Sequence, residues 1–172
     1  GYIHAGKITA QALKNEGVSH LFTLCGGHIQ SIYDGCLDLD IRVVDFRHEQ
    51  SAAHAAEGWA RATGEVGVAA VTAGPGVTDA VTAVANAQRS GVPMVLIGGQ
   101  GPRALSEMGS LQEMDHVSLM RSITKWSVTV PESRRIPDYL TTAFRKARTG
   151  VPGPVFLEMP LDILMNMEDD TV

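Results

Sequence analysis

The sequence predicts an α/β fold in which a doubly wound, six-stranded parallel sheet has helices on both faces. Short apolar runs alternate with longer segments of helical periodicity along the 172 residues. Glycines follow several of the helical segments, as they do at helix ends. The run at residues 66–71 is small or β-branched throughout, which is typical of a parallel strand covered on both faces. Strands that alternate with helices in this way pair in parallel through right-handed crossovers.

The first half of the chain predicts three helices and three strands. Residues 4–17 place their apolar side chains on one stripe, and Gly17 ends this helix. A short buried strand at 21–24 is broken by Gly26 and Gly27. The other predicted elements of this half are a helix over 29–39, a strand over 42–45, a helix over 50–63 that ends at Gly64, and the strand over 66–71.

The second half predicts two further helices and three strands around one long connection. The connection at 98–115 begins with a glycine-rich loop over 98–102 and is longer than the fold requires, which is typical of functional loops. Residues 166–172 are acidic and polar, so we expect one domain over 1–165 followed by a frayed tail or the start of a linker. The predicted elements are a helix over 77–90, a strand over 93–97, a strand over 127–130, a helix over 136–149 and a strand over 155–158.

Composition excludes some classes of partner. Apolar residues make up 44% of the chain and charged residues 19%, as in an ordinary globular protein. The net charge of −5 offers no electrostatic footprint for nucleic acid or an anionic membrane. No apolar stretch approaches the roughly 20 residues that span a bilayer, and no signal peptide is visible. Cys25 and Cys36 form no metal-binding pair, so we expect reduced thiols in a cytoplasmic protein.

Glu49 is the leading candidate for a functional residue. It stands where a predicted strand gives way to a helix, and open α/β sheets bind ligands at that edge. An acid in the first helical turn is also favoured by the helix dipole without any function. The helix that follows has a face of little bulk, which would let another backbone or subunit approach closely, and we expect a homodimer or homotetramer through this helix. This face consists of Ala52, Ala53, Ala56, Gly58 and Ala60.

Three further candidates lie at the same predicted edge. The turn Gly74-Pro75-Gly76 follows a strand and opens a helix, so it could cradle a phosphate on backbone amides or approach a flat ring. It lacks the full GxGxxG spacing, and a simple tight turn is the alternative. His28 follows the glycine pair after the first strand, and Gln112 lies in the long connection. For His28, an ordinary loop histidine and a catalytic one are equally compatible with the sequence.

Two apparent metal or nucleotide motifs fail on spacing. Residues 1–8 have Walker-A spacing of glycine and lysine, but Ile8 replaces the required hydroxyl residue. His48 and His54 stand too far apart for an HExxH zinc site. His54 and Glu57 are interpreted as a surface pair. The sequence therefore predicts no metal site in this chain.

Six stretches together resemble the N-terminal, pyrimidine-binding domain of thiamine-diphosphate-dependent enzymes. Their order and spacing extend over nearly the whole chain. Within that superfamily the chain is similar to acetolactate synthase large subunits, benzaldehyde lyase and 2-hydroxyacyl-CoA lyases. The stretches are residues 25–29, 47–64, 72–78, 111–112, 123–126 and 150–155.

The resemblance implies a carboligase or lyase that makes or cleaves a C–C bond at a 2-oxo acid, acyloin or 2-hydroxyacyl substrate. Glu49 would bind N1′ of the cofactor's aminopyrimidine and favour the imino tautomer, which removes the thiazolium C2 proton. The implied catalytic residues are Glu49, His28 and Gln112. The implied cofactor-binding residues are Glu49, Thr72, Gly74, Pro75 and Asp79, and the implied substrate-binding residues are Gly27, His28 and Gln112.

Two departures from the family pattern narrow this expectation. Asp79 stands where many relatives have Asn, and Leu111 stands where acetolactate synthases usually have Phe. Together with His28, Leu111 fits the acyloin-lyase pattern better than a dedicated biosynthetic acetolactate synthase.

The resemblance also implies that a second domain, which this sequence does not contain, completes the active site. In this family a C-terminal domain with a Gly-Asp-Gly motif holds the diphosphate and Mg²⁺, and the present sequence has no such motif. The chain would pair with the diphosphate-binding domain of a partner protomer, and alone it should be inactive. Two alternatives stay open, namely a non-catalytic dimerisation or regulatory module of the same fold, and a flavodoxin-like nucleotide binder at residues 74–76.

Overall fold

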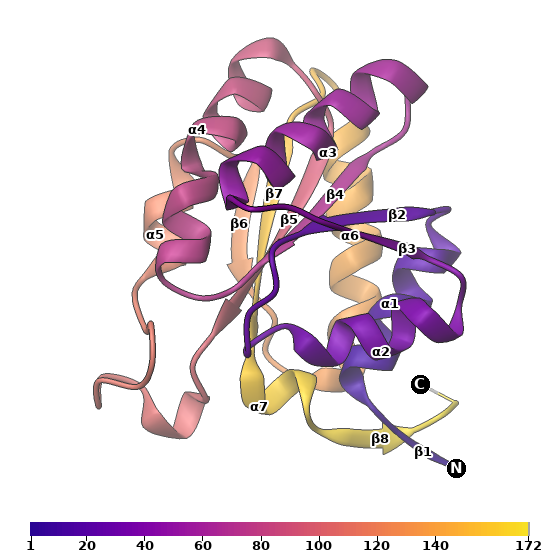
Figure 1. Cartoon of the computed structure of the whole chain (residues 1–172), viewed down its shortest axis with the longest axis vertical. Helices are drawn as coiled ribbons and strands as arrows, with labels where there is room; N and C mark the ends of the chain where they lie inside the picture. The colour runs from indigo at the N-terminus through magenta and orange to yellow at the C-terminus, as the bar shows by residue number, and fades with distance from the viewer. Residues whose placement is uncertain (172) are drawn as a thin grey trace.

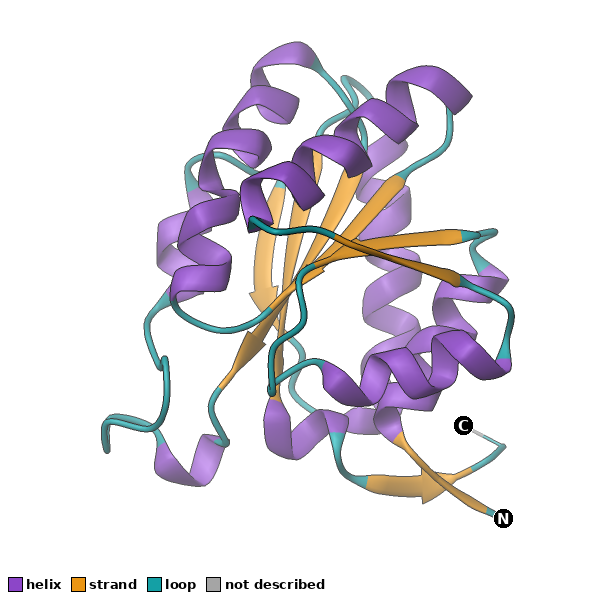
Figure 2. Cartoon of the chain, viewed as in Figure 1, coloured by secondary structure: helices purple, strands orange, loops and turns teal. Residues whose placement is uncertain are grey.

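A six-stranded parallel sheet forms the centre of the molecule in the computed structural model, which describes residues 1–171 (Figures 1 and 2). The strand order is β3-β2-β4-β5-β7-β6. The predicted fold class is therefore confirmed. The strands are β2 (His20–Thr23), β3 (Arg42–Asp45), β4 (Gly67–Val71), β5 (Met94–Gln100), β6 (Trp126–Thr129) and β7 (Pro154–Pro160).

Helices cover both faces of this sheet and form two separate apolar cores. One core is built with α1, α2 and α6, and the other with α3, α4 and α5. Figure 1 shows α3 and α4 side by side on one face and α6 on the other. The helices are α1 (Ala5–Asn15), α2 (Gln30–Asp38), α3 (Glu49–Thr63), α4 (Pro75–Ser90), α5 (His116–Arg121), α6 (Ile136–Arg148) and the short α7 (Leu161–Leu164).

The central strand β4 shows why the sequence encodes a sheet covered on both sides. Val68 and Ala70 belong to the core under α1 and α6, whereas Ala69 and Val71 belong to the core under α3 and α4. Successive side chains of a strand point to opposite faces. The side chains on both faces of β4 must therefore be apolar, which is why the sequence of this strand is one continuous apolar run.

The strand order reverses at one point of the sheet, which is where open α/β folds generally bind ligands. The chain runs from β2 outward to β3 and then returns to the other side of β2 to form β4. Such a reversal separates the loops that follow β2 and β4, and this opens a crevice at their carboxyl ends. Figure 1 shows α3 and α4 beginning near this edge.

The low-bulk face of α3 packs against other parts of the same chain. The alanines of this face are buried against the sheet and α4. The approach is so close that a side chain on Gly67 of β4 would overlap the carbonyl group of Ala56. The low bulk of the face thus serves packing within the chain, and a dimer contact through α3 would have to use its outer side. That outer side includes Gly58, where an added Cβ would meet nothing within 4 Å.

The expectation that Glu57 and His54 form a surface pair is wrong for Glu57. It is 3% exposed rather than a member of a surface pair. Its carboxylate accepts hydrogen bonds from Asn86 Nδ2 of α4 at 2.7 and 2.8 Å and from Arg61 Nη2 at 2.7 Å, and it contacts His54 Nδ1 at 3.2 Å. The residue therefore ties α3 to α4.

The long connection after β5 contains more structure than predicted. Residues 98–100, expected in a loop, continue β5 in register with β7, where Gly98 pairs with Glu158. Gly98 permits this because a side chain there would meet the ring of Phe156 at 2.5 Å. The helix α5 was also missed, since its six residues are too few for a periodic pattern.

The C-terminal segment is paired rather than frayed over its described part. β8 (Met167–Asp169) forms an antiparallel pair with β1 (Tyr2–His4), with Ile3 opposite Glu168. This pair forms a small second sheet, separate from the parallel one. Val172 lies outside the described residues, and the start of a linker stays a prediction. Within residues 1–171, none of the helices combines the length and apolar character needed to cross a membrane.

Candidate functional site

Glu49 lies at the predicted edge as the first residue of α3. Its side chain is 9% exposed, and His48 precedes it in an extended conformation. The His48 side chain caps the helix, because its Nδ1 accepts the N–H of Gln50 at 3.1 Å. The carboxylate of Glu49 has no hydrogen-bond or ion-pair partner among residues 1–171. Its oxygens are not among the fully buried polar atoms that lack a partner, so they stay open to solvent or a ligand, which makes this carboxylate the leading feature of the site.

The first turn of α4 stands opposite Glu49. A Cβ added at Gly76 would lie 3.6 Å from Glu49 Oε1 and 2.9 Å from Thr72 Cγ2. Gly76 therefore keeps the space between these two side chains open. Pro75 occupies the first position of α4 and is exposed. The structure thus brings together Glu49, Thr72 and the Gly74-Pro75-Gly76 turn, as the sequence predicted.

Asp79 extends the acidic character of this edge. Its Oδ2 lies 3.7 Å from His48 Nε2, and one ligand atom each from His48, Glu49 and Asp79 lie within 4.8 Å of one another. These three groups are the only ones among residues 1–171 that are arranged so that they could hold a cation. His48 and Asp79 are half exposed, and exposed acids are commonly clustered without an ion. The expectation that this chain has no metal site stays a prediction.

His28 bridges the crevice from the other side of the topological reversal. Its Nδ1 is 2.8 Å from Thr72 Oγ1, which links the loop after β2 to the loop after β4. Burial lowers the pKa of His28, and a hydrogen bond to the backbone of Leu111 works in the opposite direction. The net effect favours a neutral imidazole at pH 7. Gly27 beside it is exposed, with no atom within 4 Å of an added Cβ.

Gln112 meets the site through its backbone. An added Cβ at Gly74 would stand 2.7 Å from the carbonyl oxygen of Gln112. Gly74 has φ 61° and ψ −115°, a conformation that L side chains rarely adopt, and Gln112 has a positive φ of 59°. The Gln112 side chain is exposed. All the predicted site residues are therefore gathered at one edge of the sheet, although their chemical roles stay predictions.

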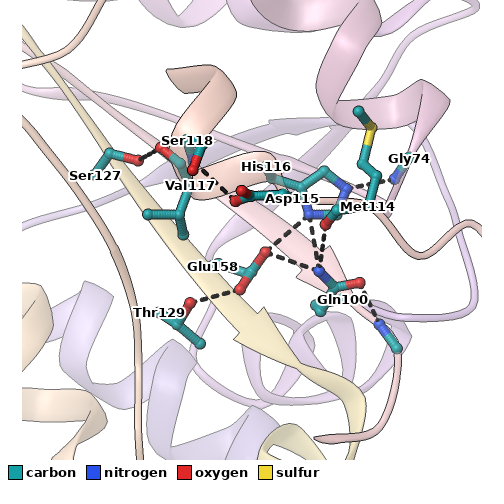
Figure 3. A network of polar contacts seen from close by, with 11 residues as sticks. Gly74, Gln100, Met114, Asp115, His116, Val117, Ser118, Ser127, Thr129 and Glu158 are labelled. Atoms are coloured by element: carbon teal, nitrogen blue, oxygen red, sulfur yellow. Dashed lines mark hydrogen bonds and ion pairs between the residues drawn. The ribbon is translucent and has the colours of Figure 1, made fainter. Parts of the chain in front are cut away.

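A buried polar network behind the Gly74 turn was not foreseen from the sequence (Figure 3). His116 is fully buried, and its Nε2 accepts the N–H of Gly74 at 2.8 Å. Its Nδ1 lies 2.8 Å from Glu158 Oε1. Gln100 and Thr129 also bond to Glu158, at 3.0 and 2.6 Å. The only signal in the sequence was an acid at the end of an otherwise apolar strand, because the histidine lies 42 residues away.

Comparison with known proteins shows the family of the chain. The family described as "Thiamine pyrophosphate enzyme, N-terminal TPP binding domain" matches residues 3–119. The 2-hydroxyacyl-CoA lyase 2 of Mus musculus is 50% identical over 161 residues, which are 94% of this chain and 26% of the relative. The protein of the same name from Homo sapiens is 48% identical over 161 residues, again 94% of this chain and 26% of the relative. The acetolactate synthase large subunit IlvG of Mycobacterium tuberculosis is 42% identical over 168 residues, 98% of this chain and 31% of that protein.

These matches confirm the resemblance found in the sequence. The chain spans about a quarter to a third of the length of these curated relatives. The family match itself extends over more than half of the chain and includes Glu49, the Gly74 turn and Gln112. The chain belongs to the family of N-terminal TPP-binding domains of thiamine pyrophosphate enzymes.

Proposed function

We propose that this chain supplies the pyrimidine-binding half of the active site of a thiamine-diphosphate-dependent carboligase or lyase. The observation that supports this most directly is the carboxylate of Glu49, a mostly buried residue whose oxygens stay accessible beside the topological reversal of the sheet. It faces a turn whose glycines leave space beside it. Family membership and the identity of the relatives agree with this reading.

The residues at this edge fit an aminopyrimidine ring. Such a ring is flat and has hydrogen-bonding nitrogens on its rim, so it needs a narrow space with an acid at one side. Gly76 keeps the space between Glu49 and Thr72 free of a side chain, and Gly74 brings backbone rather than a side chain to it. Glu49 would hold a proton at the N1′ ring nitrogen, and Asp79 and Pro75 would lie at the rim of the same space.

Bound thiamine diphosphate supplies the chemistry that makes or breaks a C–C bond next to a carbonyl group. The chain's own residues bind, orient and exchange protons. His28 is neutral at pH 7 because its pKa is lowered, so it can both donate and accept a proton near a substrate carbonyl. Gln112 and Gly27 are exposed beside it and would contact the substrate. A 2-oxo acid, an acyloin or a 2-hydroxyacyl compound is the substrate class that we propose.

The diphosphate and its Mg²⁺ would be held by a different domain, in our proposal that of a partner protomer in a homodimer or homotetramer. This assignment fits the exposure of the Gly27 and Gln112 side of the crevice. It also fits the relatives, of which the matched region is about a quarter to a third. We further propose that the outer side of α3 contributes to the subunit contact.

The test is Glu49→Gln in the complete protein, with Glu65→Gln as the matched control. Glu65 is an exposed acid beyond the other end of α3. Glu49→Gln should keep the shape of the side chain and lower kcat by at least about 100-fold, within the range usual for loss of a proton-transferring group. Glu65→Gln should leave kcat unchanged. If Glu49→Gln keeps full turnover, the catalytic proposal is wrong.

A second experiment tests the alternative of a non-catalytic dimerisation or regulatory module. Titration calorimetry of the complete wild-type protein with thiamine diphosphate and Mg²⁺ should give a saturable heat. Absence of binding, together with intact self-association by light scattering, would favour the module instead. Tight binding of NAD, FMN or ATP would favour the nucleotide-binding alternative at residues 74–76.

A further inference from the structure

The network of Figure 3 determines which nitrogen of His116 has the proton. The N–H of Gly74 points at His116 Nε2 at 2.8 Å, so Nε2 must present a lone pair. The proton is therefore on Nδ1, which donates to Glu158 Oε1 at 2.8 Å. The ring is neutral, and Glu158 is the charged partner. A buried carboxylate thus acts on a backbone amide through one imidazole.

Gln100 and Thr129 complete the set of donors to Glu158. Gln100 Nε2 donates to Glu158 Oε1 at 3.0 Å and to the carbonyl oxygen of Met114 at 2.7 Å. Its Oε1 accepts the N–H of Gly101 at 2.9 Å, which fixes the orientation of the amide. Thr129 Oγ1 donates to Glu158 Oε2 at 2.6 Å. Three donors therefore satisfy a carboxylate that is only 6% exposed, as a buried charge requires.

The network joins the elements around the crevice to one another. Glu158 and Gln100 come from β7 and β5, Thr129 ends β6, and His116 begins α5. The group that they hold is the N–H of Gly74, the residue that precedes α4 and lies against the backbone of Gln112. Without His116 this buried amide would lose its acceptor, and the unusual φ and ψ of Gly74 would lose a support.

We propose that Glu158 and His116 are positioning residues that fix the Gly74 turn and the Gln112 loop at the distance that the cofactor's pyrimidine ring and the substrate require. The effect on cofactor and substrate binding rests on the proposed function. The way in which the two residues hold the Gly74 turn rests on the hydrogen-bond geometry alone. Neither residue needs to touch the cofactor or the substrate. His116 acts through the Gly74 amide, and Glu158 acts by holding the histidine in one tautomer.

The test uses three substitutions in the complete protein. His116→Leu removes both hydrogen bonds of the ring, whereas His116→Gln offers one acceptor oxygen and one donor nitrogen in a similar volume. Leu119→Ala on the exposed side of the same helix is the matched control. Hydrogen exchange of a peptide spanning residues 72–77, measured by mass spectrometry without cofactor, reports on the Gly74 turn directly. The KM for thiamine diphosphate reports on how a change in the Gly74 turn affects cofactor binding.

His116→Leu should speed exchange in residues 72–77 about tenfold or more and raise the cofactor KM about tenfold to 100-fold, as expected when a buried donor loses its partner. His116→Gln should return both values to within about threefold of wild type, and Leu119→Ala should change neither. A purely structural role would lower thermal stability without this local exchange or this rescue. If exchange and KM stay unchanged in His116→Leu, the positioning role is wrong.

A milder variant keeps the proposal testable if His116→Leu does not fold. Thr129→Val keeps the branched shape and removes one donor from Glu158, so both readouts should rise by about two- to threefold. No change in either would also overturn the proposal. Failure of the proposed function can be distinguished from failure of the positioning role, because the exchange experiment needs no cofactor. A wild-type protein that binds no thiamine diphosphate would refute the function while the exchange data still test the network.

Discussion

Replacing Gly67 with alanine tests how closely α3 is seated on the sheet. The added Cβ would lie 1.8 Å from the carbonyl oxygen of Ala56 and 2.5 Å from its carbonyl carbon. Real Cβ contacts essentially never fall below 3.0 Å, so the helix backbone must move by about 1.2 Å, the difference between 3.0 and 1.8 Å. No flexible side chain can absorb this movement, because both sides of the contact are main chain and Ala56 is fully buried.

The expected cost follows from this geometry. Overpacking a core usually costs about 1–3 kcal/mol, and we expect a value near the upper end, about 3 kcal/mol. With a urea m value of about 2 kcal/mol/M, the unfolding midpoint would fall by roughly 1.5 M. Glu49 begins the same helix two turns before Ala56, so the variant should also lose activity in the complete protein.

Gly58→Ala is the matched control for this prediction. It makes the same chemical change on the outer side of α3, where nothing lies within 4 Å of the new Cβ. Alanine should stabilise the helix by about 0.5–1 kcal/mol, so the midpoint should rise. Urea unfolding of both variants, followed by far-UV circular dichroism, measures the difference. A cost below about 1 kcal/mol for Gly67→Ala would refute the claim that backbone contact sets the position of α3.

Three further outcomes concern ionisable groups. Burial opposes ionisation of Glu57, but the hydrogen bonds to its carboxylate outweigh this and hold its pKa below the ordinary value of 4.5. The stability that ionised Glu57 contributes is therefore fully present above pH 4.5. It is lost as the pH falls through the lower pKa of the folded state. Glu57→Gln should therefore reduce the free energy of unfolding by about 1–3 kcal/mol at pH 7 and flatten its acid dependence, in urea titrations at several pH values. Burial raises the pKa of Tyr33 to about 12, so stability from its neutral phenol is complete below the ordinary value of 10.0 and is lost as the pH rises toward 12. An absorbance titration should show one late-ionising tyrosine that Tyr33→Phe removes; without such a group the assignment fails. Burial also raises the pKa of Cys36 to about 12, whereas Cys25 is exposed, so a thiol reagent should label Cys25 in the native protein and spare Cys36.

The sequence predicted the fold because its strands and helices are strongly patterned. The strand at residues 42–45 was predicted with the bounds that the structure has, and the helix expected over 50–63 differs from α3 by one residue. These segments have continuous apolar runs or clear stop residues. Residues 98–100 were assigned to a loop because glycines usually break strands, whereas here they let β5 pass close to its neighbours.

The candidate site was only partly visible in the sequence. Glu49, the Gly74 turn and His28 could be placed because each lies three or four residues after a predicted strand, and parallel strands bring such residues to one edge. The partnership of His116 with Glu158 could not be predicted, since it joins a short irregular helix to a strand 42 residues away. What packs on the alanine-rich face of α3 could not be predicted, because a small-residue face looks the same whether a sheet, a helix or a second subunit packs on it.

The pairing of β1 with β8 has a mechanical consequence. Gly1 and Asp170 lie side by side, joined by a hydrogen bond of 3.0 Å from the Asp170 N–H to the Gly1 carbonyl oxygen. Force that pulls these two points apart would load the bonds of this antiparallel pair one after another, as in opening a zipper. The small pair would open first and at low force, and tension would reach the six-stranded sheet only after it had opened.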